Sequence, residues 1–145
     1  MHFFASIWRV TVGSLALSAL TVPTVAVSVH IAAKYSLRRH VAGHEGKRIP
    51  IWSFRTQQLP ILHALAEVNV TEAYFKEVIR MFRDSDVDVR VKMGLAASAK
   101  AAVIHRSQSS FFALAERCGA HGLFEYNQII ARGVFSIFIV FSLWY

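Results

Sequence analysis

Apolar and polar residues follow each other along this chain with the spacing of α-helices. Residues 10–33 contain no Asp, Glu, Lys or Arg. At about 1.5 Å rise per residue, such a helix is long enough to cross the roughly 30 Å hydrocarbon core of a bilayer. Small hydroxyl residues lie within it at helical spacing: Thr11, Ser14, Ser18, Thr21 and Ser28. They share one face, where a neighbouring helix can approach closely. We therefore expect a buried helix, bent at Pro23, and keep a membrane span as the alternative.

Two further helices are predicted in the middle of the chain. Apolar residues repeat with a helical period over residues 54–82. Ser85 and Asp88 form a predicted capping box that opens the next helix, and its many alanines favour helix formation and close packing. This helix is expected to end at Cys118, because Gly119 readily adopts the left-handed conformation that stops helices.

The fold class follows from the number of helices and the length of their connections. Three long helices joined by short connections pack antiparallel, so we predict an all-α protein built as an antiparallel helical bundle. Residues 41–50 contain two glycines and end in a proline, and are predicted to be a loop. Residues 134–145 are nearly all apolar, too short to span a membrane and without helix caps. We therefore set an apolar tail of unrelated character, residues 131–145, apart from the helical chain before it.

Positive charge is concentrated in one segment. The chain has 16 Lys and Arg against 9 acidic residues, a net charge of +7. Between positions 34 and 55 a single acid, Glu45, stands against six basic residues: Lys34, Arg38, Arg39, Lys47, Arg48 and Arg55. Guanidinium groups form paired hydrogen bonds with phosphates, so this segment is the candidate anion site. A solvated helix end is the alternative, because cations also favour the C-terminal end of a helix. No nucleic-acid-binding motif is recognisable, and we expect no nucleic-acid partner.

Few residues are candidates for catalysis or metal binding. The only cysteine, Cys118, is expected to be a small buried residue and not a nucleophile. His40 and His44 have no carboxylates or cysteines at ligand spacing, so no metal site is expected. Small residues over positions 118–122 would let the backbone approach a flat or phosphate-bearing ligand closely.

Four segments, taken in order, resemble the C-terminal helical region of acyl-CoA oxidases and acyl-CoA dehydrogenases, most closely the oxidase branch. They are residues 9–33, Tyr-Ser-Leu-Arg-Arg at 35–39, Phe-Arg-Thr-Gln-Gln at 54–58 and Ala-Glu-Arg-Cys-Gly-Ala-His-Gly at 115–122. The resemblance covers about residues 8–130. It implies a FAD flavoprotein that oxidises the Cα–Cβ bond of an acyl-CoA in fatty acid β-oxidation. It also implies a homodimer whose helical region completes the flavin pocket of its partner, in the peroxisome or the cytoplasm.

The resemblance assigns individual residues to the cofactor. Arg39 matches the arginine that meets the flavin diphosphate. Gln58 or Gln57 matches the glutamine near the adenosine end of FAD. Gly119 matches the first glycine of a paired-glycine turn. These residues are the expected cofactor contacts.

This sequence also departs from the family pattern. Glu116 stands where the family usually has a glutamine that helps to hold the cofactor, and Ala120 replaces the second glycine, which implies weaker flavin binding. The family's catalytic glutamate would fall within residues 133–145, which contain no carboxylate. Because proton abstraction from carbon needs a positioned base, we assign no catalytic residue and expect a truncated piece of the enzyme, inactive alone.

Two other functions remain compatible with the residues. One is a small membrane-anchored protein whose basic loop lies against anionic headgroups. The other is a non-enzymatic helical module that pairs with a full-length relative.

Overall fold

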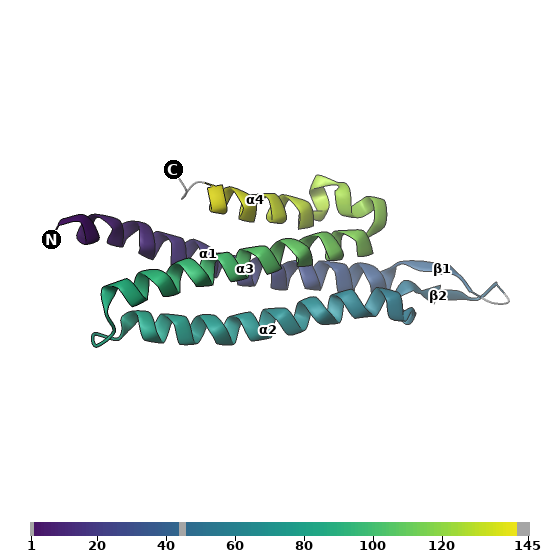
Figure 1. Cartoon of the computed structure of the whole chain (residues 1–145). Helices are drawn as coiled ribbons and strands as arrows, with labels where there is room; N and C mark the ends of the chain where they lie inside the picture. Colours follow the sequence, from purple (N-terminus) through teal and green to yellow (C-terminus); the bar gives the residue numbers. More distant parts are fainter. Residues whose placement is uncertain (1, 44–45, 142–145) are drawn as a thin grey trace.

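The chain folds into four packed helices, and helical segments account for 86% of the structure. The computed structural model describes residues 2–43 and 46–141. Successive helices run in opposite directions, and α4 lies along α3 (Figure 1). The helices are α1 (His2–Arg38), α2 (Arg55–Arg83), α3 (Val89–Arg117) and α4 (Ile129–Phe141). The prediction of a helical bundle is confirmed for the described residues, which are mostly helical and form four helices where the sequence pattern predicted three.

Helix α1 packs through the hydroxyl face that its sequence pattern predicted. Thr11, Ser18, Thr21 and Ser28 are all buried. The Ser18 hydroxyl donates to the carbonyl of Ser14 at 2.7 Å, and the Ser28 hydroxyl to that of Thr24 at 3.0 Å. Because these two hydroxyls bond within their own helix, they can be buried without a partner from a neighbour, whereas the buried hydroxyl of Thr21 has no hydrogen-bond partner. The helix continues through Pro23 without a break.

The connection between α2 and α3 differs from the predicted capping box. Asp88 is itself the N-cap of α3, and its side chain accepts from the backbone N–H of Arg90. Ser85 instead donates to the carboxylate of Asp86, whose own N–H donates to Asp84. The prediction of Ser85 as the cap is wrong, because these aspartates form a turn before the helix begins.

The predicted loop over residues 41–50 contains a short β-hairpin. Strands β1 (His40–Ala42) and β2 (Arg48–Pro50) pair antiparallel, with Val41 opposite Ile49. Gly43 directly follows β1, and a Cβ at its position would lie only 3.0 Å from the carbonyl oxygen of Lys47. A glycine therefore fits this close approach of the backbone. The hairpin extends from one end of the bundle (Figure 1).

Helix α4 was not predicted, because its sequence is apolar on nearly all sides. Its inner face is made of Ile129, Gly133 and Ser136, which are buried. Gln108 of α3 donates to the Gly133 carbonyl at 3.0 Å and also bonds the Ser136 hydroxyl. Helix α4 therefore crosses the proposed boundary between residues 130 and 131, and residues 142–145 lie outside the described part of the chain.

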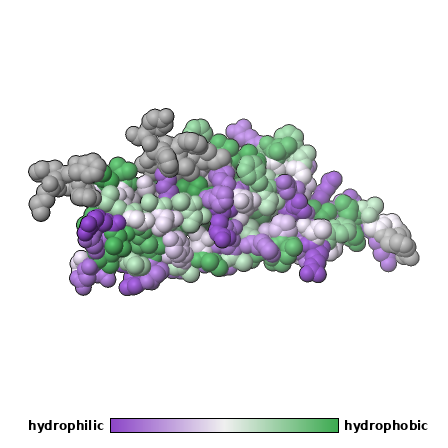
Figure 2. Space-filling view, viewed as in Figure 1, coloured by the Kyte–Doolittle hydropathy of each residue, from purple (hydrophilic) through white to green (hydrophobic). Residues whose placement is uncertain are grey.

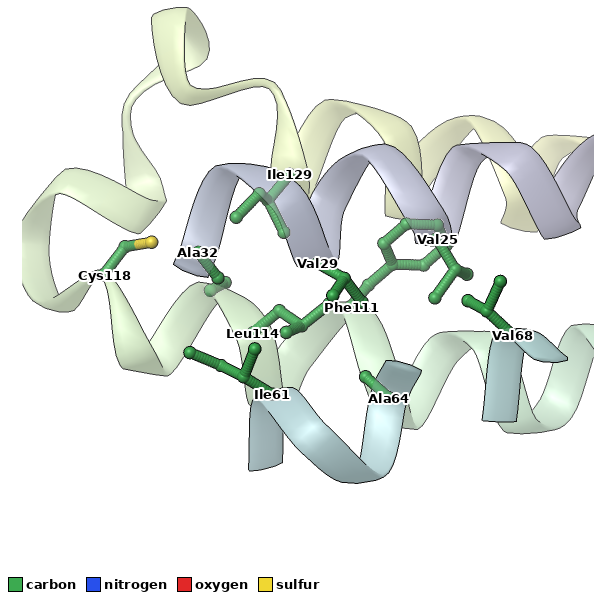
Figure 3. Packing of buried hydrophobic residues seen from close by; sticks show 11 residues of the cluster. Val25, Val29, Ala32, Ile61, Ala64, Val68, Phe111, Leu114, Cys118 and Ile129 are labelled. Atoms are coloured by element: carbon green, nitrogen blue, oxygen red, sulfur yellow. The ribbon is translucent and has the colours of Figure 1, made fainter. Parts of the chain in front are cut away.

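Two hydrophobic clusters fill the bundle. The larger one, drawn in Figure 3, joins side chains from all four helices: Val25, Val29, Ala32, Ile61, Ala64, Val68, Phe111, Leu114, Ala115, Cys118 and Ile129. The second joins α1, α2 and α3 towards the other end: Leu15, Phe75, Val78, Ala96, Ala99 and Val103. The larger cluster lies directly beneath the helix ends that carry the predicted cofactor residues.

Candidate functional site

Three segments that are far apart in the sequence, and that hold the residues matched to the family's cofactor contacts, meet at one end of the bundle. We call this the basic end; it comprises the end of α1 (residues 34–39), the start of α2 (residues 55–58) and the end of α3 (residues 116–120). Gln57 joins the three, since its amide nitrogen donates to the Ser36 hydroxyl at 2.8 Å and to the Arg117 carbonyl at 2.7 Å. Ser36 in turn donates to the carbonyl of Ala32 at 2.7 Å. These bonds fix the positions of the three helix ends relative to one another.

Gln58, the other glutamine matched to the adenosine end of FAD, makes a local bond. Its amide nitrogen donates to the carbonyl of Trp52 at 2.8 Å, within the short 3₁₀ turn (Ile51–Ser53) that precedes α2. Both glutamines therefore have structural roles: Gln57 between helices, and Gln58 at the entry to α2.

Arg117 is a residue of this end that sequence reasoning missed. Its guanidinium donates to the carbonyl of Thr56 at 3.0 Å and lies 3.5 Å from the carboxylate of Glu116. Its Nε is buried without a hydrogen-bond partner. The signal in the sequence was a cation in the last turn of a helix, which is too common to single out one arginine.

The cations of α1 lie together on the surface of the basic end. Lys34, Arg38 and Arg39 line a hollow of about 590 Å³, together with His30, Ile31 and Tyr35. All three cations are exposed, and none takes part in the ion pairs found among the described residues. Glu45 and His44 lie outside the described residues. Three cations without a counter-charge in the part of the chain that the structure describes favour an anion with several oxygens, such as a diphosphate.

The end of α3 has the left-handed stop that the sequence predicted. Gly119 has a φ of +58° and follows Cys118, the C-cap. The small residue at position 122 is explained by packing within the chain, because a Cβ there would lie 2.2 Å from the carbonyl oxygen of Ala115. Glu116 and Ala120, the two departures from the family pattern, are exposed on either side of this stop.

Aromatic side chains surround the turn that follows α3. His121 lies beside Tyr35, with 5.8 Å between ring centroids, and also contacts Phe124 and Tyr126. The rings of Phe124 and Tyr126 stack, with centroids 5.6 Å apart and planes 12° from parallel. The sequence pattern gives no signal for these rings, because they lie in two short 3₁₀ turns (Gly119–Leu123 and Glu125–Asn127) and not in a longer helix or strand.

Cys118 has the environment of a structural residue. It is fully buried, and burial raises the pKa of its thiol, while a hydrogen bond with Asn127 acts in the opposite direction. A thiol held in its protonated form is a poor nucleophile. Across residues 2–43 and 46–141, no three His, Cys, Asp or Glu side chains gather as metal ligands.

Helix α1 is also the part of the structure relevant to a membrane. Ile7–Arg38 is long and apolar enough to cross a bilayer by length and composition, and 33% of its most apolar window is buried in the bundle. Val12, Leu20 and Val27 are more than two-fifths exposed on the face away from the hydroxyl residues. One face of α1 therefore packs in the bundle and another remains open.

No protein-family model matches the chain, and no curated protein matches its sequence. Functional inference therefore depends on the chemistry of the basic end.

Proposed function

We propose that this bundle is the flavin-holding helical part of a FAD-dependent acyl-CoA oxidoreductase of the oxidase and dehydrogenase type. One observation carries the proposal. The segments matched to the family's cofactor residues are far apart in the sequence, and Gln57 joins their ends through Ser36 and Arg117. If these segments resembled the family in composition alone, there would be no reason for them to lie together in the folded chain.

The chemistry of the basic end fits the diphosphate of a dinucleotide. Arg39, with Lys34 and Arg38 beside it, provides guanidinium and ammonium donors around one hollow, and such donors bind phosphate oxygens through charge-assisted hydrogen bonds. The Gln57 bonds hold the backbone beneath them, so little ordering of these helix ends is needed on binding. FAD, when bound, would supply the acceptor for the electrons that leave the Cα–Cβ bond of an acyl-CoA.

In this proposal the chain binds FAD weakly and is inactive alone. Glu116 places an exposed carboxylate at the end of α3, where it repels a diphosphate. Residues 133–145 contain no carboxylate that could remove the α-proton. In this proposal the bundle contributes helices to a homodimer, in the peroxisome or the cytoplasm, and a base from elsewhere completes the reaction.

Titration of the purified chain with FAD, followed by flavin fluorescence, tests the proposal. We expect saturable binding in the micromolar range. Riboflavin, which lacks the diphosphate, should bind at least about tenfold more weakly, because bonds to charged groups contribute about 1.5–3 kcal/mol. Added inorganic pyrophosphate should compete. Absence of binding at high micromolar FAD, or equal affinity for riboflavin, would contradict the proposal.

A second candidate function is a membrane-anchored protein, favoured by the open apolar face of α1. Val12, Leu20 and Val27 leave this face available to lipid, and the cations at the C-terminal end of α1 would meet anionic headgroups. Cell fractionation separates the two functions. Release by lysis or salt agrees with the flavin proposal, whereas a requirement for detergent supports the anchor.

A further inference from the structure

The turn after α3 exposes a group of aromatic rings that we call the ring platform, made of His121, Phe124 and Tyr126. Phe124 is 53% exposed and Tyr126 68% exposed, although their rings stack on each other. A hydrogen bond between His121 Nδ1 and the Tyr126 hydroxyl joins the third ring to the pair. Figure 2 shows hydrophobic residues on the surface over this turn, with hydrophilic ones beside them. The rings are thus ordered against one another while their outer faces meet water.

Local backbone bonds hold the ring platform in place. It lies on two 3₁₀ turns, η3 (Gly119–Leu123) and η4 (Glu125–Asn127). The Asn127 N–H donates to the carbonyl of Phe124 at 3.0 Å, and Asn127 is itself buried. Gln128 follows with a φ of +65° and leads directly into α4. Because the turn is anchored at both ends, its rings have a defined orientation. In this they differ from an aromatic residue exposed singly on a surface, which is common and needs no special explanation.

Tyr35 connects the ring platform to the cations of α1. Its ring lies 5.8 Å from that of His121, and Tyr35 also lines the hollow that contains Lys34, Arg38 and Arg39. Tyr35 therefore links the ring platform to cations that have no counter-charge among the described residues. A ligand that satisfies both parts has a flat ring system joined to phosphates.

We propose that the ring platform stacks the base of a nucleotide whose phosphates bind Lys34, Arg38 and Arg39. The phosphate contacts in this inference rest on the proposed function. The inference adds the position of the nucleotide base. The exposed faces of Phe124 and Tyr126 suit a purine, because stacking requires a flat partner and imposes no hydrogen-bond pattern. A lipid headgroup or free phosphate uses the cations alone and leaves the rings without a partner.

The test uses the intact chain with ADP, inorganic pyrophosphate and a short oligonucleotide as probes in isothermal titration calorimetry. ADP should bind about tenfold more tightly than pyrophosphate, because stacking of one base contributes roughly 5- to 150-fold in affinity. Phe124→Leu and Tyr126→Leu should each remove most of that difference while the affinity for pyrophosphate stays unchanged. Phe112→Leu is the matched control, since Phe112 is an exposed ring (58%) on α3 outside the platform.

Several outcomes would overturn the ring contact. These are equal affinities for ADP and pyrophosphate, ring variants that behave as Phe112→Leu does, or an oligonucleotide that binds far more tightly than ADP. Circular dichroism shows whether each variant is folded. If a variant is not folded, the affinities of the unaltered chain for ADP and pyrophosphate test the inference. The two proposals can fail separately. ADP binding that depends on the rings, without FAD binding, keeps this inference and ends the flavin proposal. FAD binding that is unchanged in the ring variants keeps the flavin proposal and ends this inference.

Discussion

The two ends of the bundle are held together by different kinds of contact. At the end far from the hairpin, apolar side chains such as Phe75, Val78 and Ala96 fill the space between α1, α2 and α3. At the basic end, Gln57 adds hydrogen bonds to Ser36 and Arg117 above an apolar cluster. Apolar contacts contribute most of the stability but have no directionality, whereas hydrogen bonds fix distance and angle. The contrast indicates that the basic end needs defined positions and the far end needs only close packing.

Two glycines of α3 and its following turn give the largest predicted difference between the ends. A Cβ at Gly122, near the basic end, would lie 2.2 Å from the Ala115 carbonyl oxygen, whereas a Cβ at Gly94 would meet nothing within 4 Å. We expect Gly122→Ala to lower the free energy of unfolding by about 3 kcal/mol or more. Gly94→Ala, within the helix, should raise it by about 0.5–1 kcal/mol. Urea denaturation measures both, and similar small effects at the two positions would show that the basic end is not closely packed.

Replacement of Gln57 gives the next largest effect. Gln57→Leu keeps the side-chain size but leaves the Arg117 carbonyl without this donor, and we expect a loss of about 2 kcal/mol in the free energy of unfolding. Gln58→Leu is the control, because Gln58 has a single local bond to Trp52 and should lose only about 1 kcal/mol. Equal losses in urea denaturation would contradict the role of Gln57 as the link between three helices.

Cys118 gives a smaller, pH-dependent effect at the basic end. Burial raises the pKa of its thiol in the folded chain, whereas the thiol of the unfolded chain has an ordinary pKa of about 8.5. As the pH rises, the unfolded chain therefore loses this proton at a lower pH than the folded chain does. The free energy of unfolding should therefore decline as pH rises from about 8 towards 10. Cys118→Ala should show a shallower decline over the same window, measured by urea denaturation at each pH. An identical slope for both proteins would show that the thiol is not responsible.

The sequence predicted the elements whose signals are local. The hydroxyl face of α1 and the helix stop at Gly119 are both present in the structure, because each depends only on helical spacing or on one residue's backbone freedom. The cap of α3 was misplaced by three residues, since Asp84, Ser85 and Asp86 offer competing turn bonds. Helix α4 was missed because a nearly uniform apolar sequence shows no polar face to mark its period.

The candidate site depended on long-range contacts that local patterns do not contain. The basic cluster was visible in the sequence, because its charges are close together along the chain. The link from Gln57 to Arg117 joins residues 60 positions apart, and the contact of Tyr35 with His121 likewise depends on how α1 and α3 pack. The resemblance placed these segments in one region but gave Gln57 a ligand-binding role, whereas its amide nitrogen bonds the chain itself.

We propose above that the cations at the end of α1 hold the diphosphate of FAD. Its most direct test is a pair of FAD titrations, one with Arg39→Gln and one with Arg106→Gln. Arg106 is an exposed arginine of α3 outside the basic end, so both variants lose the same charge. We predict that Arg39→Gln weakens FAD binding at least about tenfold, as expected for loss of a charge-assisted bond to phosphate, and that Arg106→Gln leaves it unchanged. Equal affinities for the two variants would contradict the claim.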